Sequence, residues 1–168
     1  MSNKKPLVGI IMGSASDLPI MQAAADILKK FGVPYELDVI SAHRTPEKAI
    51  AYSQNAVKTG LKVIIAGAGG AAHLAGVIAA CTPLPVIGVP IKASISLDGW
   101  DSLLSMVQMP SGIPVACVAV NGAQNAGILA AQMIATGDNT LLEKIINFKE
   151  DLKKKVYASS EEIRKKKK

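Results

Sequence analysis

A histidine and an arginine stand side by side, His43 and Arg44, within the segment Ser-Ala-His-Arg-Thr-Pro of residues 41–46. The chain has only two histidines, and this one follows a run of residues that predicts a strand. An arginine can hold a phosphate or a carboxylate through two parallel hydrogen bonds, and a histidine can move protons near neutral pH. The pair therefore indicates chemistry on an anionic substrate. A solvated pair at the start of a helix is the structural alternative.

A second segment, Gly-Ser-Ala-Ser-Asp at residues 13–17, joins a predicted strand to a predicted helix. Small residues let backbone amides face an anion, and the start of the helix adds partial positive charge. Ser14 and Ser16 could donate to a phosphate, and Asp17 could accept from ribose hydroxyls. The alternative is a tight turn in which Asp17 is an ordinary helix cap. The segment is neither a Walker A loop nor a GxGxxG fingerprint.

A third segment, Gly-Ala-Gly-Gly-Ala-Ala-His-Leu at residues 67–74, follows another apolar run. Its glycines would allow a ligand to approach the backbone closely. The alternative is close packing of helix on strand, with His73 only capping the helix. We therefore predict a small-residue loop over residues 67–71, followed by a helix.

Apolar runs alternate with helical patterns along the whole chain. Strands are predicted over residues 7–12, 35–40, 62–66, 84–89 and 115–120. Helices are predicted over residues 18–31, 46–59, 73–80, 123–136 and 139–156. This alternation predicts an α/β fold of βαβ units with a parallel five-stranded sheet between two layers of helices. The three segments above all fall at the carboxyl edge of that sheet, where ligands collect.

Local signals refine two of these elements. Glu36 and Asp38 alternate with apolar neighbours, which is typical of an edge strand. Thr45 as the capping residue and Pro46 in the first turn predict the start of the second helix. The last helix has little sheet left to cover, and we expect it to pack on a neighbouring subunit.

Composition favours one compact domain that hides much of its surface. The chain has 168 residues, of which 49% are hydrophobic and 19% charged, and so few charges suggest an oligomer. The net charge of +6 is a property of the end of the chain, because residues 149–168 carry nine basic and four acidic side chains. We expect the basic residues 164–168 to be a solvated, frayed end rather than a nucleic-acid-binding arm.

Several other classes of protein are disfavoured. Two histidines without a carboxylate cluster at ligand spacing do not provide the ligands of a metal site, so no metal is expected. Cys81 and Cys117 are far apart in apolar surroundings and are interpreted as small buried residues of a reducing compartment. No signal core is seen in residues 1–6, and the uncharged stretch 63–91 is interrupted by glycines and prolines. We expect a cytoplasmic protein without membrane contact.

Five segments together resemble one enzyme family. They are the segments at residues 13–17 and 41–46 described above, Ala-Gly-Ala-Gly-Gly-Ala-Ala-His-Leu at 66–74, Asp-Ser-Leu-Leu at 101–104 and Val-Gln-Met-Pro at 107–110. In order and spacing the chain is similar to the class I N5-carboxyaminoimidazole ribonucleotide mutases of purine biosynthesis. The resemblance runs from about residue 7 to residue 135.

The resemblance implies a homo-octamer of flavodoxin-like subunits. The implied reaction moves a carboxylate from N5 to C4 of an aminoimidazole ribonucleotide through transient carbon dioxide, without ATP, metal or other cofactor. From the chain length we expect a single catalytic domain over residues 1–160, with a basic tail over residues 161–168 that lies outside the resemblance. Ala75 departs from the proline that many relatives have, and residues 92–99 are expected to be variable and without a catalytic role.

The resemblance also implies roles for individual residues. His43 would be the catalytic acid and base. The other implied contacts are Ser16, Ser41 and Arg44 to the 5′-phosphate, Ser14 in support of that loop, Asp17 to the ribose, and Gly69, Gly70, His73 and Leu74 around the base and carbon dioxide.

Three other functions remain open at this point. A class II relative would carboxylate aminoimidazole ribonucleotide directly with carbon dioxide. A flavodoxin-like module would bind a nucleotide or a flavin without turnover, although aromatic residues to sandwich a flavin are few. A nucleic-acid-binding protein would rely on the basic tail and would bind with a steep salt dependence.

Overall fold

Five parallel strands form the single sheet of the protein. The computed structural model describes residues 5–166, and within them the strand order is β2-β1-β3-β4-β5. The strands are β1 (Val8–Met12), β2 (Tyr35–Val39), β3 (Val63–Gly69), β4 (Val86–Ile91) and β5 (Ala116–Cys117). This is the flavodoxin-like order, so the predicted fold is confirmed, and β2 lies at the edge as its polar alternation indicated.

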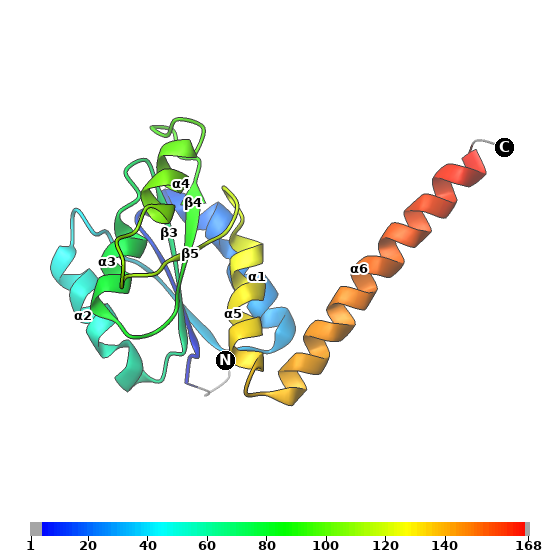
Figure 1. The fold of residues 1–168 in the computed structure, drawn as a ribbon, viewed down its shortest axis with the longest axis horizontal. Coiled ribbons are helices and arrows are strands. Elements are labelled where there is room, and N and C mark those ends of the chain that lie inside the picture. Colours follow the sequence, from blue (N-terminus) through cyan, green and yellow to red (C-terminus); the bar gives the residue numbers. More distant parts are fainter. Residues whose placement is uncertain (1–4, 167–168) are drawn as a thin grey trace.

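Helices cover both faces of the sheet (Figure 1). They are η1 (Ala15–Asp17), α1 (Leu18–Phe31), α2 (Pro46–Thr59), α3 (Leu74–Cys81), α4 (Trp100–Val107), α5 (Ala123–Ala135) and α6 (Asn139–Lys166). One core lies between the sheet and α1, α5 and the start of α6, and the other between the sheet and α2, α3 and α4. The central strands are therefore buried on both faces, which explains their continuous apolar sequences.

The first strand shows how one apolar run serves both cores. Ile10 and Met12 belong to the core under α1 and α5, whereas Ile11 belongs to the core under α2 and α3. All three side chains are fully buried. Because successive side chains in a strand point to opposite faces, only an uninterrupted apolar run can fill two cores at once.

The first two long helices have the predicted boundaries. Both end at glycines in the left-handed conformation, Gly32 with a φ of 77° and Gly60 with a φ of 101°. Each glycine amide bonds back to carbonyls of the last turn, which stops the helix and satisfies its free backbone acceptors.

The helices start near the predicted residues, but their capping hydrogen bonds differ from those predicted. Asp17 makes no capping bond to α1; instead Ser14 caps the preceding short helix η1 by accepting from the amide of Ser16. Thr45 stands before α2 but makes no capping bond, and His73 before α3 makes none either. These side chains are thus available for other contacts, described below.

Four elements differ from the sequence predictions in extent. Strand β3 continues through Gly69, so residues 67–69 are strand and not loop, because they pair with residues 89–91 of β4. Strand β5 has only two residues. Helix α4 was not predicted, and α6 continues to Lys166, so residues 161–166 are helical and not frayed. Lys167 and Lys168 lie outside the described residues.

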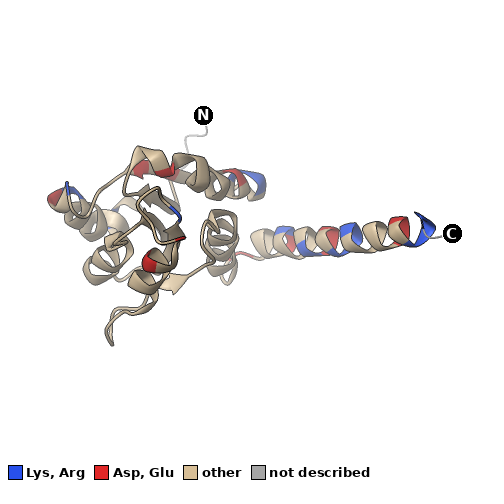
Figure 2. Cartoon of the chain, turned by 90° about the horizontal axis from the view of Figure 1, so that it is seen from above, with Lys and Arg blue, Asp and Glu red and all other residues tan. Residues whose placement is uncertain are grey.

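Helix α6 leaves the body of the molecule after its first two turns (Figure 1). Only Leu141 and Ile145 are buried, and the remaining turns expose apolar side chains such as Leu152, Val156 and Ile163. Charged residues are dense along this helix and sparse on the body (Figure 2). In the described part of the chain, no helix has both the length and the apolar character needed to cross a membrane.

Candidate active site

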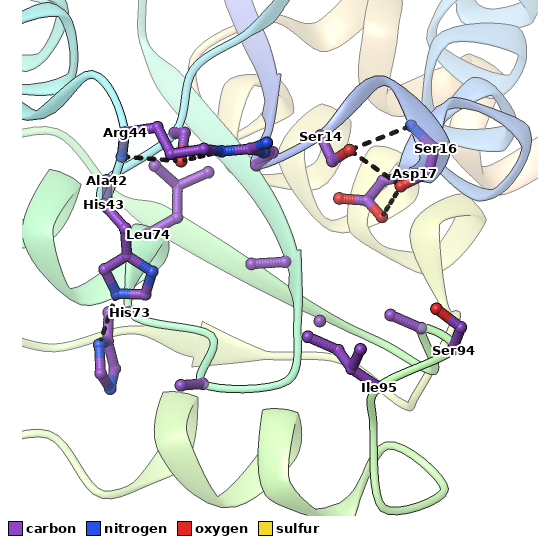
Figure 3. A pocket seen from close by; sticks show the side chains of 16 residues that line it. Ser14, Ser16, Asp17, Ala42, His43, Arg44, His73, Leu74, Ser94 and Ile95 are labelled. Atoms are coloured by element: carbon purple, nitrogen blue, oxygen red, sulfur yellow. Dashed lines mark hydrogen bonds between the residues drawn. The ribbon is translucent and has the colours of Figure 1, made fainter.

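The loops that follow β1, β2, β3 and β4 surround one cavity of about 410 Å³ at the carboxyl edge of the sheet. Nine of the ten residues named from the sequence line it: Ser14, Ser16, Asp17, Ser41, His43, Arg44, Gly69, His73 and Leu74. The tenth, Gly70, is buried and does not line the cavity. The segments at residues 13–17, 41–46 and 67–74 therefore belong to a single site (Figure 3), whereas those at 101–104 and 107–110 do not line it.

Arg44 connects the loops that follow β1 and β2. Its Nη2 donates to the carbonyl of Gly13 at 2.9 Å, and its Nε and backbone amide donate to Ser41 Oγ at 3.4 and 3.2 Å. Thr45 Oγ1 donates to the carbonyl of Ser41 at 3.0 Å and accepts from its amide at 3.1 Å. The guanidinium is thus held beside the serine loops, with further N–H groups free to bind an anion.

The two histidines of the chain meet inside the cavity. His43 Nε2 lies 2.9 Å from His73 Nδ1, and the two rings are perpendicular with their centroids 5.0 Å apart. His73 stands at the start of α3 and comes from the third segment, thirty residues further along the chain. The alternative in which His73 only caps its helix is wrong, because its ring bonds to His43 and not to the helix.

The loop after β1 places two hydroxyls and a carboxyl at the cavity. Ser16 Oγ donates to Ser14 Oγ at 2.9 Å and lies 3.4 Å from Asp17 Oδ1. Asp17 is only 5% exposed. Burial raises the pKa of its carboxyl, and the hydrogen bond from Ser16 and the positive charge of Arg44 partly oppose that shift.

The loop after β4 is the part of the site that the sequence analysis missed. Ala93, Ser94 and Ile95 line the cavity, although no residue of 92–99 was named as a site residue from the sequence. Their residue types carry no chemical signal. Their position after a parallel strand could have indicated them, because every such loop opens at the same edge of the sheet. Ala42, Ala68 and Ala71 also line the cavity, and alanine likewise gives no sequence signal of a functional role.

The donor set of this cavity suits an organic anion. It combines an arginine, two histidines, four serine hydroxyls and the backbone of small residues. Among residues 5–166 there is no group of three or more His, Cys, Asp or Glu side chains that could hold a metal ion. Cys81 and Cys117 are free and partly buried, and neither lines the cavity.

Comparison with known proteins gives consistent matches over nearly the whole chain. The sequence model described as AIR carboxylase matches residues 7–155. The N5-carboxyaminoimidazole ribonucleotide mutase of Pyrococcus horikoshii is 57% identical over 97% of this chain and 92% of its own length. That of Synechocystis is 55% identical over the same shares. The phosphoribosylaminoimidazole carboxylase of Schizosaccharomyces pombe is 56% identical over 96% of this chain, which corresponds to only 29% of that protein.

Solved structures agree with the sequence matches. The crystal structure of Treponema denticola PurE superposes with a TM-score of 0.82 at 28% identity, over 94% of this chain and 98% of that one. A variant of PurE2 from the same organism superposes with a TM-score of 0.84 at 27% identity. With a family match that includes every loop of the cavity, the chain belongs to the AIR carboxylase family.

Proposed function

We propose that this protein is an N5-carboxyaminoimidazole ribonucleotide mutase, an isomerase of de novo purine biosynthesis that acts in the cytoplasm. It converts N5-carboxyaminoimidazole ribonucleotide to 4-carboxy-5-aminoimidazole ribonucleotide. One observation carries the proposal: His43 and Arg44 line a single cavity together with the serines of the loop after β1. The mutases of Pyrococcus horikoshii and Synechocystis, similar over nearly their full lengths, support the same reaction.

The polar side of the cavity binds the ribose 5-phosphate part of the substrate. Ser16, Ser41 and Arg44 hold the phosphate, Ser14 supports their loop and Asp17 accepts from a ribose hydroxyl. The bonds of Arg44 to the carbonyl of Gly13 and to Ser41 support this role, because they hold the guanidinium in place before the substrate arrives.

The opposite side of the cavity binds the aminoimidazole ring beside His43. Gly69, Gly70, His73 and Leu74 border the ring and the carbon dioxide. Small and apolar walls leave room for a flat ring, and the two histidines supply the only side chains there that can give and take a proton.

The reaction uses one proton twice. His43, as an imidazolium, protonates N5 while the N5–carboxylate bond breaks and carbon dioxide leaves. C4 of the electron-rich ring then attacks the carbon dioxide and forms the new carbon–carbon bond. Neutral His43 removes the proton from C4, which restores the aromatic ring and the imidazolium. A single acid that becomes the base suits an imidazole, since it exchanges protons near neutral pH.

The cavity must keep the carbon dioxide between these steps. Recombination within the site competes with escape, and holding both partners together favours recombination. The side of the cavity formed by the end of β3 and the loop after β4 supports this role, because residues such as Ala68 and Ala93 there are small and apolar.

The homo-octamer is part of the proposal. The exposed apolar side chains of α6 support an assembly in which this helix packs on another subunit. Analytical ultracentrifugation would then give a mass eight times that of the 17.5 kDa chain.

The deciding experiment assays the purified protein with two substrates in the absence of ATP. Conversion of N5-carboxyaminoimidazole ribonucleotide at a rate above that with aminoimidazole ribonucleotide and bicarbonate is expected. A preference for the second pair would make the protein a carboxylase, the activity named for the Schizosaccharomyces pombe relative. Binding of a nucleotide without turnover of either substrate would make it a binding module.

A further inference from the structure

The loop after β4 builds one wall of the cavity without bringing a catalytic group to it. Ala93, Ser94 and Ile95 face the cavity, and Figure 3 draws Ser94 and Ile95 on the other side from Arg44. Ile95 is 81% exposed, so its own burial does little to hold it in place. Something else must position this wall.

A hydrogen-bonded cluster around Asp101 fastens the loop to the start of α4. Asp101 Oδ1 accepts from Ser96 Oγ at 2.5 Å and from the amide of Ser102 at 2.9 Å. Ser96 Oγ in turn accepts from the amide of Gly99 at 2.9 Å, which closes the loop on itself. The hydrogen bond from Ser96 holds the pKa of Asp101 below its usual range, so the carboxylate is ionised at neutral pH.

The cluster is tied to the rigid sheet through Ser102. This side chain is fully buried, and its Oγ donates to the carbonyl of Ile91 at 3.1 Å, at the end of β4. The path runs from β4 through α4 to Asp101 and then to Ser96, which immediately follows the wall residues. The carboxylate is therefore one link between a fixed element and the exposed loop, beside the contact of Ser96 Oγ with Ser102 Oγ at 3.4 Å and the bond from the Lys92 amide to Asn121 Oδ1 at 2.9 Å.

The wall also touches the glycines that border the base. A Cβ added to Gly69 would lie 2.6 Å from the Cβ of Ala93, and one added to Gly70 would lie 3.1 Å from Ile95. The end of β3 and the loop after β4 are therefore packed together beside the cavity, and a shift of one changes the width of the cavity that both line.

We propose that Asp101 is a positioning residue for the nucleotide site: by holding Ser96, it sets the position of the wall formed by Ala93, Ser94 and Ile95. The inference rests on the proposed function, since that function places the aminoimidazole ring against this wall. Asp101 does not line the cavity and acts only through the loop.

The test is steady-state kinetics with N5-carboxyaminoimidazole ribonucleotide on Ser96→Ala, Asp101→Ala and the double variant. Each single variant is expected to raise KM about tenfold, the effect of losing one hydrogen bond to a charged group. The double variant should raise KM by the same factor and not a hundredfold, because both changes remove one shared bond. Ser96→Thr keeps the hydroxyl and should retain the KM of the wild type.

Asp138→Ala is the matched control. Asp138 Oδ1 accepts from the amide of Leu141 at 3.0 Å, a comparable carboxylate-to-backbone bond far from the cavity. This variant should lower the melting temperature and leave KM unchanged. If it raises KM as Asp101→Ala does, or if the two single changes multiply in the double variant, the positioning role is refuted. If Asp101→Ala fails to fold, the KM of Ser96→Ala compared with that of Ser96→Thr tests the positioning role instead.

A second measurement separates this inference from the proposed function. If the wild type converts the substrate and Ser96→Ala has the same KM as the wild type, the inference is refuted while the proposed function stands. Without wild-type turnover the proposed function fails, and calorimetric titration with 5-aminoimidazole ribonucleotide takes over as the readout. A tenfold weaker affinity of Ser96→Ala for this nucleotide then supports the positioning of the wall by Ser96 and Asp101. Equal affinity of the variant and the wild type, or no binding by the wild type, refutes it.

Discussion

His43 Nε2 lies 2.9 Å from His73 Nδ1, and this contact joins the loop after β2 to the start of α3. One nitrogen of the pair must donate and the other must accept, so the two facing nitrogens cannot both carry a proton. The contact also orients the His43 ring within the cavity.

Replacing His43 by Asn should abolish most turnover while the protein still binds nucleotide. We expect kcat to fall at least ~100-fold, the usual contribution of a positioned acid and base. Stopped assays give kcat, and calorimetric titration with the product nucleotide gives the affinity. A kcat within a few-fold of the wild type would remove His43 from the mechanism. His73→Asn is the companion variant, since it removes the ring that contacts His43.

Replacing Arg44 by Lys should weaken substrate binding more than it slows the reaction. Lysine keeps the charge but loses the planar fork that binds Gly13 and Ser41 and that is proposed to hold the phosphate. We expect KM to rise about tenfold, the cost of losing one charge-assisted hydrogen bond. Lys48→Arg, at an exposed ion pair with Asp38, is the matched control and should leave KM unchanged. An equal KM in Arg44→Lys would show that Arg44 does not bind the phosphate.

Replacing Asp17 by Asn should stabilise the protein at neutral pH. Because the pKa of Asp17 is raised in the folded state, that state takes up its proton more readily than the unfolded chain. Its contribution to the free energy of unfolding is then fully present below the unfolded pKa and is lost as pH rises through the folded pKa. Thermal unfolding should give Asp17→Asn the higher melting temperature at pH 7, with a smaller difference at pH 4.

The opposite pH trend would show that the Asp17 carboxylate is net stabilised by Ser16 and Arg44. Activity supplies an independent check on the same variant, because Asn can still accept from a hydroxyl but has lost the charge. A rise in KM is therefore expected to accompany the rise in melting temperature.

Replacing Gly127 by Ala should destabilise the packing of α5 on α1. An added Cβ would lie 2.4 Å from Ile27 Cγ2 and 2.9 Å from the carbonyl of Ala24, and a backbone atom cannot move aside easily. Overpacking of this kind costs about 1–3 kcal/mol. Replacing glycine by alanine inside a helix gains about 1 kcal/mol, so the cost of overpacking exceeds this gain over most of its range. Thermal unfolding should show a lower melting temperature.

The control for this prediction is Gly137→Ala. No atom lies within 4 Å of a Cβ added there, and its φ is not in the left-handed region. Its melting temperature should equal or exceed that of the wild type. If both substitutions lower it equally, close packing of α1 and α5 is not the cause.

Removing residues 164–168 should leave activity unchanged. Within the described part, this segment makes one exposed ion pair, from Lys166 to Glu162 at 2.8 Å, and such surface pairs contribute about 0–1 kcal/mol. Turnover and sedimentation of the truncated protein are the measurements. Loss of the assembly or of activity would give the basic end a role beyond solvation.

Local signals in the sequence were enough to predict the elements whose ends are set by nearby residues. Helices α1 and α2 have the predicted ranges, because proline at their starts and Gly32 and Gly60 at their ends act within one turn of the chain. The buried strands followed from uninterrupted apolar runs. The reactive residues were also visible, because a phosphate and a proton require particular side chains wherever the fold places them.

Elements that depend on distant partners were not predictable in this way. Residues 67–69 have a loop-like composition, yet they form strand because β4 offers them a pairing edge. Helix α4 has only two turns and follows Gly99 without a side-chain cap, so its sequence carries no starting signal. Its place depends on burial of Ser102 and Met106 against the sheet.

The sequence by itself determined the fold class and nearly all the residues that could do chemistry, because strand periodicity and side-chain type are local properties. Only the tertiary structure decided that Arg44 bonds to Gly13, that His43 meets His73, and that the loop after β4 forms a wall. These contacts join segments far apart in the chain. They exist because parallel strands bring their carboxyl ends to one edge of the sheet, a consequence of packing that no single segment encodes.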